Sequence, residues 1–477
     1  MSNLDIQDFF GSINFGRVRG FFIKNQDFAL TPEAATVLAQ IACFQNSLPQ
    51  GSPCSPTVSN LVGDILDVHL ARLAATHGCT YTRYADDLSF STNKREFPEA
   101  IAVQLGSTHD WVLGKGLTRC LSISGFVANS KKTRMQYLGS RQEVTGLIVN
   151  EKVNIAKEYR YRVRAMVHRV LQTGGFDISK TVVDASGKSV LQSGAGDLRQ
   201  LHGMLAFIDS IDLYNRTLQE RRVEAAAAAD GIKRARPDIT KKEEMYRRFL
   251  IFKELYTASM PVVVGEGKTD NIYLLHAIRS LAEKFPMLAE IGADKAIKMR
   301  VRLFKCYGTS TGRILRLRGG APDLKGFLYT YKKEIARFKA PGMKHPVVMV
   351  IDSDDGAIPI LKVVAQITKA ALSGRESYIH VVGNLYVVPT PIQTIGGKSK
   401  IEDFFDDAVT GIKLNGKTFS ADNDMDSDGH YGKVAFARDV VRAKAESIDF
   451  AGFHPLLENI SKSIMAHYAK SEPKAMA

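Results

Sequence analysis

The spacing of apolar and polar residues differs between successive parts of this 477-residue chain. In the first 150 residues, β-forming runs at Tyr81–Tyr84, Leu88–Ser91 and Val144–Val149 alternate with helical stretches such as Thr57–Ala75, which is typical of an α+β layer. From residue 154 to about residue 214 the apolar spacing is that of amphipathic helices. The pattern therefore predicts an α+β domain followed by a helical one.

The C-terminal part has a third pattern of apolar residues. Nearly continuous apolar runs of strand length lie at Pro261–Glu266, Pro346–Asp352 and Tyr378–Val382, separated by helical segments. Strands that are apolar throughout are buried on both faces, as in parallel α/β sheets. Two of these runs end in acidic residues. Because chemistry gathers at the carboxyl ends of such strands, we expect a functional site there.

The main boundary lies at Arg221–Glu244, where an alanine run, Gly231, Pro237 and dense charge are typical of a surface connection between domains. A helix is predicted to restart at a capping box formed by Thr240 and Glu243. The predicted divisions are residues 1–150, 151–220, 221–257 and 258–477.

Composition narrows the function classes. Lys and Arg total 64 against 50 Asp and Glu, a net charge of +14, which suits a polyanionic partner such as nucleic acid. Charge alone does not decide this, because many basic proteins bind no nucleic acid. The five cysteines are scattered without a C-x-x-C pair, so neither a zinc site nor a disulfide framework is indicated. With no apolar run of membrane-spanning length, we expect a cytoplasmic protein without a membrane partner.

Two adjacent carboxylates, Asp86 and Asp87, stand between β-forming runs in TRYADDLSFS. Like charges at a hairpin tip raise the cost of ionising each other, so a cation must offset them. Phosphoryl transfer to a growing nucleic acid uses two divalent ions roughly 3.5 to 4 Å apart, bridged by carboxylates. A third carboxylate, Asp5 in LDIQDFF, completes a set of oxygen ligands suited to Mg²⁺.

These residues carry a family resemblance. The run YADD at Tyr84–Asp87, preceded by LPQGSPCSPTVSN at Leu48–Asn60 and by LDIQDFF at Leu4–Phe10, resembles the motif series of reverse transcriptases in order and separation. The Val-Thr-Gly segment at Val144–Gly146 resembles the retron branch. The resemblance implies as partners a structured non-coding RNA that serves as template and primer, its branched DNA product and deoxynucleoside triphosphates, with Mg²⁺ as the cofactor.

The same resemblance implies roles for single residues. Phe10 falls where the family keeps an aromatic ring that would collide with a ribose 2′-hydroxyl, thereby selecting deoxynucleotides. Gln50 and Gly51 fall where the backbone approaches the incoming nucleotide and template, which a side chain at residue 51 would obstruct. Lys132 matches the lysine that meets the triphosphate, and Lys131 stays open as an alternative.

In the helical region, Val163, Val167, Val170 and Leu171 share one helix face, while the arginines lie largely off it and two tyrosines interleave with them. Taken alone, this pattern of arginines and tyrosines fits an ordinary solvated helix face equally well. With the resemblance, it becomes a thumb that grips phosphates and packs aromatic rings near sugar or base. The residues assigned to nucleic-acid binding are Arg160, Arg162 and Arg164.

One departure from the family is serious. Its complete polymerases carry a fingers region and a first palm strand ahead of the residue that matches Asp5, whereas only four residues precede Asp5 here. Either the true start lies upstream or the chain is a truncation. We expect this polypeptide alone to polymerise poorly or not at all.

A second constellation follows the C-terminal strands, where Glu266 ends one apolar run and Asp352 and Asp354 end another. A glutamate at one strand end and Asp-x-Asp at the next resemble the Toprim domain shared by topoisomerases, primases and some nucleases. The resemblance implies a second Mg²⁺ site. Glu402 and Lys433 resemble later positions of nuclease-type Toprim domains, where Lys433 would stabilise charge on a scissile phosphate. The plain alternative is a pair of acidic turns after ordinary strands.

The whole order resembles retron reverse transcriptases with a fused Toprim effector, which serve in defence against bacteriophage. The predicted fold is an α+β palm and helical thumb followed by an α/β Toprim domain with a mainly parallel sheet, and a homo-oligomer is possible. Two alternatives stay open: a polymerase-inactive scaffold that binds RNA, and a Toprim nuclease regulated by the polymerase half. The predicted domains are a palm with truncated fingers (1–150), a thumb (151–220), a linker with a connecting helix (221–257) and Toprim (258–477).

Overall fold

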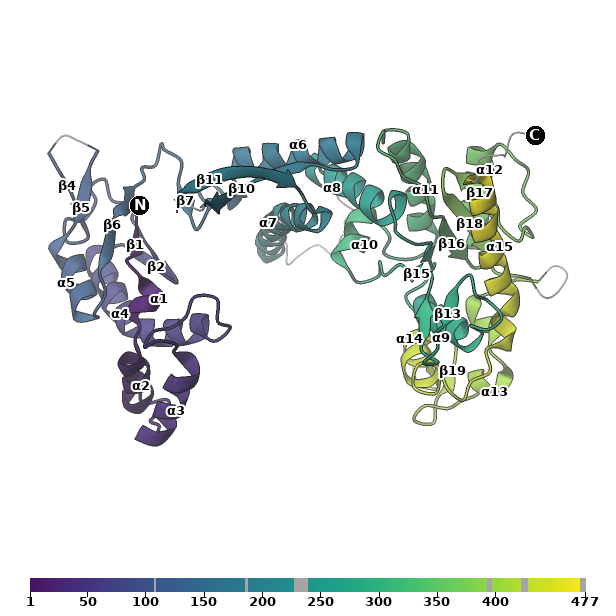
Figure 1. The fold of residues 1–477 in the computed structure, drawn as a ribbon, viewed down its shortest axis with the longest axis horizontal. Coiled ribbons are helices and arrows are strands. Elements are labelled where there is room, and N and C mark those ends of the chain that lie inside the picture. The colour runs from purple at the N-terminus through teal and green to yellow at the C-terminus, as the bar shows by residue number, and fades with distance from the viewer. Residues whose placement is uncertain (107–108, 185–187, 227–238, 393–396, 422–427, 472–477) are drawn as a thin grey trace. The chain divides into compact units, whose positions relative to one another are not determined.

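The computed structural model describes residues 1–106, 109–184, 188–226, 239–392, 397–421 and 428–471. The fold is mixed α/β with several sheets. It divides into two compact units, one formed by Met1–Arg160 with Ile211–Ala228 and the other by Tyr161–Ser210 with Ala229–Ala477, and Figure 1 colours the chain in sequence order through both. None of the described helices combines the length and apolarity needed to cross a membrane.

The first unit is built on a four-stranded antiparallel sheet with strand order β2-β3-β1-β6. Its strands are β1 (Ser2–Ile6), β2 (Thr80–Tyr84), β3 (Asp87–Ser91) and β6 (Ala128–Met135). Leu4, Ile6, Leu88 and Phe90 are buried in one apolar core with residues of the helices. Those helices are α1 (Phe9–Ser12), α2 (Phe15–Lys24), α3 (Pro32–Ala42), α4 (Ser55–His77) and α5 (Lys115–Ile123). The strands and the long helix expected before residue 100 are confirmed.

Two small sheets complete this unit. One pairs β4 (Ala102–Gln104) with β5 (Trp111–Leu113), and the other joins β7 (Glu143–Val144), β8 (Leu147–Ile148) and β9 (Asn154–Ile155). The expected single run at 144–149 is therefore wrong in detail. Thr145 and Gly146 take positive φ angles of 48° and 81°, which turn the chain and split the run into two short antiparallel strands.

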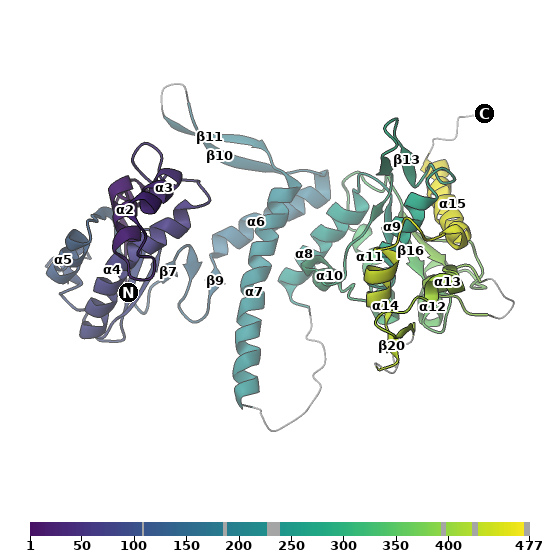
Figure 2. The same cartoon turned by 90° about the horizontal axis from the view of Figure 1, so that it is seen from below.

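The region predicted to be helical between residues 154 and 214 contains α6 (Lys157–Thr173) and α7 (Leu198–Ala226). It also contains a two-stranded antiparallel hairpin, β10 (Asp177–Val183) and β11 (Ser189–Ala195), which the sequence prediction missed. Gly174, with φ of 87°, follows the last residue of α6. The β-branched residues that come after it favour a strand. Figure 2 shows the hairpin as a separate pair of arrows.

The second unit has a five-stranded sheet of order β15-β12-β16-β18-β17. The strands are β12 (Val262–Val264), β15 (Arg302–Leu303), β16 (Val347–Ile351), β17 (Ile379–Val382) and β18 (Leu385–Pro389). Neighbours are parallel except for β17 and β18, so the expected mainly parallel sheet is confirmed. The run at 378–382 is antiparallel instead, because only Gly383 and Asn384 separate it from β18, too few residues for a crossover.

Helices and short turns surround this sheet, and α15 packs along β16 and β18. They are α8 (Lys241–Ile251) with the π-helical η1 (Phe252–Tyr256), α9 (Asp270–Ser280), α10 (Ser310–Leu315), α11 (Ala321–Ile335), α12 (Ala357–Thr368), η2 (Ile401–Phe404), α13 (Asp407–Thr410), α14 (Lys433–Ala435), η3 (Phe436–Val441), η4 (Ala451–Phe453) and α15 (His454–Ser471). Two further pairs of short strands are β13 (Ala289–Ile291) with β14 (Ile297–Met299) and β19 (Thr418–Phe419) with β20 (His430–Tyr431).

The predicted linker at 221–257 is only partly described, because residues 227–238 lie outside the described ranges. Its second half forms α8 and η1. The capping box is confirmed: the Thr240 side chain accepts a hydrogen bond from the backbone of Glu243, whose carboxylate accepts one from Thr240 N–H at 2.9 Å.

Candidate active sites

Three aspartates meet at one end of the antiparallel sheet in the first unit. Asp5 in β1 stands directly opposite Asp87 in β3. Asp86 occupies the adjoining turn, where its backbone carbonyl accepts a hydrogen bond from Ile6 N–H at 2.9 Å. The structure therefore brings together residues that are some eighty positions apart in sequence, and Asp5 is buried, with 8% of its surface exposed.

The charges at this sheet end interact. Burial raises the pKa of Asp87, the carboxylates of Asp86 and Asp5 raise it further, and Lys132 lowers it. Lys132 Nζ in β6 lies 2.8 Å from Asp5 Oδ2, and this contact raises the pKa of the ammonium. Lys132 thus offsets part of the negative charge of the three aspartates. Lys131 is its neighbour on the strand, in the stretch where the register between β1 and β6 shifts.

The turn that carries Asp86 is held by a residue that the sequence did not single out. Arg83 donates to both carboxylate oxygens of Asp67 in α4, at 2.7 and 2.6 Å, and to the carbonyl of Ala85 at 3.2 Å. Ala85 has a φ of 51°, which is uncommon for a residue with a side chain. Tyr81 also donates to Asp67, at 2.7 Å. An ion pair that buries the Arg83 side chain therefore positions the acidic turn, and no local sequence signal pairs these residues.

The residues expected on the nucleotide side lie on α1 and on the loop before α4. Phe10 packs edge-to-face on Phe9, with ring centroids 5.4 Å apart. Gly51 has a φ of 94°, and no protein atom lies within 4 Å of the position that a Cβ would take. The glycine is therefore required by the backbone conformation and faces open space. Among the described contacts, none joins Phe10, Gln50 or Gly51 to the three aspartates.

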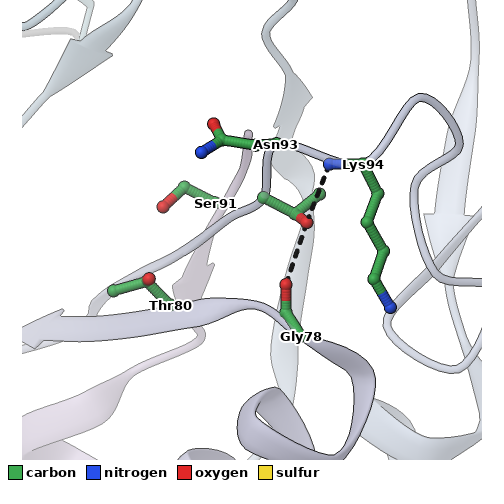
Figure 3. A pocket seen from close by; sticks show the side chains of 6 residues that line it. Gly78, Thr80, Ser91, Asn93 and Lys94 are labelled. Carbon is green, nitrogen blue, oxygen red and sulfur yellow. Dashed lines mark hydrogen bonds between the residues drawn. The ribbon is translucent and has the colours of Figure 1, made fainter.

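The opposite end of the β2–β3 hairpin carries a polar hollow of about 420 Å³. Figure 3 shows the Thr80 and Ser91 side chains on the two strands, which pair at these residues. Thr92 Oγ1 donates to the Gly78 carbonyl at 2.9 Å, and Lys94 Nζ donates to the His77 carbonyl at 2.8 Å. Four steps along the strands, roughly 13 Å at strand rise, separate the Thr80–Ser91 pair from the pair that contains Asp87, so the hollow is not part of the aspartate site.

A second acidic site lies at the carboxyl ends of β12 and β16 in the second unit. The backbone N–H of Asp352 donates to Glu266 Oε2 at 3.1 Å, which brings the two predicted strand-end acids together. Asp352 Oδ1 accepts a hydrogen bond from Ile401 N–H at 3.0 Å. Asp354 Oδ1 accepts one from Gly356 N–H at 2.8 Å and so shapes the next turn.

Burial dominates the electrostatics of this second site. It raises the pKa of Asp352 to about 8, with further contributions from Asp270, Glu266 and Glu402, while Lys433 lowers it. Burial likewise raises the pKa values of Glu266, Asp270 and Glu402. For Lys433, burial lowers the pKa, but Glu402, Asp352 and Asp270 raise it and the net direction is upward. The site therefore gathers more carboxyl groups than Lys433 alone could offset if all of them were ionised.

Two members of this site were missed in the sequence. Asp270, in the first turn of α9, is 5% exposed and accepts a hydrogen bond from Gly267 N–H at 2.7 Å. The Tyr307 hydroxyl donates to the carbonyls of Gly265, at 2.9 Å, and Glu266. The spacing of Glu266 and Asp270 across a strand-to-helix turn was a usable signal for the aspartate, whereas nothing in the sequence places Tyr307 there.

The donor sets of both sites suit a hard cation, because they consist of carboxylate oxygens. In the second site, Lys433 Nζ lies 3.0 Å from Glu402 Oε2. The other oxygen, Oε1, is buried and has no hydrogen-bond partner in the described structure, so it has an open acceptor position. As the side chains stand, no three His, Cys, Asp or Glu groups in the described part of the chain enclose one metal ion.

The amphipathic helix predicted after residue 154 is confirmed as α6. Val163, Val167, Val170 and Leu171 are buried on one face. Arg162 and Arg164 are exposed on another, whereas Arg160 is half-buried.

The first site gathers acidic groups and a lysine at one sheet end, an arrangement suited to two-metal phosphoryl transfer. Comparison with known proteins points the same way. A 211-residue stretch is 31% identical to the retron Ec86 reverse transcriptase of Escherichia coli, covering 44% of this chain and 55% of that protein. The retron Mx162 and Mx65 reverse transcriptases of Myxococcus xanthus are 33% identical over 227 residues and 32% identical over 196 residues.

Those two stretches cover 44% and 38% of this chain, and 44% and 43% of the respective relatives. The chain thus spans about half the length of the curated relatives it matches. No protein-family model matches the chain. The similarity to proteins named retron reverse transcriptases implies a reverse-transcriptase fold for the part of the chain that it covers.

Proposed function

We propose that this chain is a retron-type RNA-directed DNA polymerase that makes RNA-linked DNA from a structured non-coding RNA, with a Toprim nuclease-like effector, in antiphage defence. The observation that carries the polymerase assignment is the pairing of Asp5 with Asp87, with Asp86 in the adjoining turn. Similarity to three proteins named retron reverse transcriptases supports it.

In this proposal Asp5, Asp86 and Asp87 are the residues that would hold Mg²⁺, and the bound ions would supply activation of the primer hydroxyl and positive charge for the leaving pyrophosphate. Lys132 leaves Asp5 and pairs with the triphosphate, a contact for which its ammonium is suited. The Gly51 backbone lies against the nucleotide, and Phe10 selects deoxyribose. Gln50 lies beside Gly51, where the backbone approaches the incoming nucleotide and the template.

In the second unit, Glu266, Asp352 and Asp354 would hold Mg²⁺, which would supply positive charge to a bound phosphodiester, and Asp270 and Glu402 are the neighbouring acidic groups. Lys433 stabilises the charge that develops on the scissile phosphate. The unpartnered oxygen of Glu402 supports this assignment, as does the raised pKa of Asp352, because both favour an added cation.

Primer extension on an RNA template tests the polymerase. The wild-type chain is compared with the double variant Asp86→Asn and Asp87→Asn, with Asp110→Asn as a matched exposed aspartate. We expect any Mg²⁺-dependent synthesis to disappear in the double variant alone. The amount of DNA that the wild-type chain makes in this assay also tests the expectation that it polymerises poorly or not at all by itself. RNA that copurifies with wild type and double variant alike, with no synthesis by either, would instead indicate the RNA-binding scaffold.

Cleavage of labelled nucleic acid in Mg²⁺ tests the second site independently. We expect Glu266→Ala to abolish cleavage and the palm double variant to retain it. Cleavage that survives Glu266→Ala overturns the Toprim assignment. A regulated nuclease is favoured if cleavage is present while synthesis is absent in the wild type.

A further inference from the structure

A hollow of about 420 Å³ lies between α6 and the base of the β10–β11 hairpin, within the second unit. Its lining residues from α6 are Arg162, Ala165, Met166 and Arg169, and those from the hairpin side are Phe176, Asp177, Ile178 and Ser179. The floor is apolar and the rim is polar and charged. Its size falls within the range of small-molecule sites, roughly 300 to 1,000 Å³.

One guanidinium on the rim is held in place. Arg169 NH2 lies 2.7 Å from Asp177 Oδ2, and both side chains remain more than half exposed. An exposed ion pair of this kind contributes little stability. The pair does orient the Arg169 guanidinium at the edge of the hollow, and a guanidinium plane is a surface on which a nucleobase stacks.

The floor is rigid for a separate reason. Phe176 is 4% exposed, and a Cβ at Gly196 would fall 2.2 Å from its ring. The Gly196 N–H donates to the Phe176 carbonyl at 2.8 Å. The Gly196 backbone therefore packs directly against the Phe176 ring. The hollow is thus preformed and does not depend on a mobile aromatic side chain.

We infer that this hollow binds a single unpaired nucleotide, with the base inserted over Met166 and Phe176 and stacked on the Arg169 guanidinium. Arg162, on the same rim, contacts the adjoining phosphate. Asp177 Oδ1 and the Ser179 hydroxyl accept hydrogen bonds from a base that carries an exocyclic amino group. The inference rests on the proposed RNA-binding role of α6 and adds that the partner presents a base outside its helical stack.

An unpaired nucleotide suits the hollow better than a paired one. Bases within a duplex are stacked on both faces and do not enter a lateral hollow, so paired nucleic acid would contact α6 only through its phosphates. Stacking of one base contributes about 1 to 3 kcal/mol, and a difference of 1.4 kcal/mol corresponds to about tenfold in affinity.

The test measures equilibrium binding by fluorescence anisotropy, without Mg²⁺ or deoxynucleotides. Two labelled RNA hairpins differ only in one bulged adenosine. We expect the wild-type chain to prefer the bulged hairpin by about tenfold. Ala165→Phe fills the hollow without changing charge, and Arg169→Ala removes the stacking plane. Both variants should reduce the preference to less than about twofold. Their affinity for the fully paired hairpin should fall far less than their affinity for the bulged hairpin.

Arg164→Ala is the matched control, because Arg164 is exposed on α6 but does not line the hollow. It should weaken both RNAs alike and leave the preference intact. Equal binding of both hairpins by the wild type, or an unchanged preference in a folded Ala165→Phe variant, overturns the inference. The same pair made as DNA distinguishes an RNA base from one of the DNA product. The preference should persist in the Asp86→Asn and Asp87→Asn double variant, so failed synthesis and failed base binding are separable.

Discussion

The backbone N–H of Asp352 donates a hydrogen bond to Glu266 Oε2 at 3.1 Å. These residues follow β16 and β12, which are parallel neighbours, so the bond joins two acids at the edge where such sheets usually carry their chemistry. Asp352 reaches a pKa of about 8 there, chiefly through burial. The neighbouring cation, Lys433, therefore matters for stability as well as for the proposed chemistry.

Lys433→Met should destabilise the second unit by roughly 3 kcal/mol. Its partner Glu402 has only 2% of its side chain exposed, and a buried carboxylate that loses its cation carries an uncompensated desolvation cost. Urea unfolding of the full chain measures the change. Lys462→Met removes an exposed ion pair to Glu458 and should change stability by less than about 0.5 kcal/mol. Equal effects of the two substitutions would contradict the argument.

Lys132→Met should weaken binding of a deoxynucleoside triphosphate by about tenfold, because a charge-assisted contact to phosphate is lost. Lys131→Met removes the same charge one residue away, at a lysine that makes no ion pair with Asp5 among the described contacts, and should leave affinity within about twofold. Anisotropy of a fluorescent dUTP in Mg²⁺ gives both values without requiring turnover. If the two variants lose affinity equally, net charge and not position explains the effect.

The features that local patterns encode were predicted from sequence. The capping box of Thr240 and Glu243 formed where it was predicted. The apolar runs at 261–266 and 346–352 became the parallel strands β12 and β16 because each is buried along its whole length. The amphipathic spacing of α6 gave its buried face. In each case the signal lies within one or two turns or strands of the chain.

The features that depend on distant partners were not predicted. The hairpin β10–β11 was taken as helix, although its β-branched residues favoured strands. Tyr307 joins the acidic site only because the fold brings its hydroxyl to the carbonyls of Gly265 and Glu266. Arg83 and Asp67 come from a strand and a helix whose packing no local pattern specifies. The domain boundaries and the roles of Phe10 and Gln50 stay predictions.

Arg83→Met should destabilise the first unit by roughly 3 kcal/mol. The Arg83 side chain is 6% exposed, and its loss leaves the carboxylate of Asp67, 30% exposed, without its bidentate partner. Replacing both residues, as Arg83→Met with Asp67→Leu, should cost less than the sum of the single changes, since no unpaired charge remains. A double-mutant cycle from chemical unfolding provides the coupling energy, and strict additivity would contradict a linked pair.

Acid should weaken the second unit through His467, which is 5% exposed in α15. Its Nε2 lies 2.9 Å from the Met343 carbonyl. Burial lowers its pKa, with His380 and Lys470 adding to the effect and the Met343 carbonyl opposing it. Because the folded pKa lies below the unfolded value of about 6.5, the stabilising contribution is complete above pH 6.5 and is lost as pH falls through the folded pKa.

His467→Gln keeps an amide donor for the Met343 carbonyl and removes the titration. Between pH 7 and pH 5 we expect it to flatten the decline in unfolding free energy by up to about 1.4 kcal/mol per pH unit, the limit for one proton. His345 and His276 carry lowered pKa values as well, so some slope should persist. Urea unfolding across this pH range measures it, with His168→Gln on the exposed face of α6 as the control. A slope in His467→Gln as steep as in His168→Gln would show that another group controls acid sensitivity.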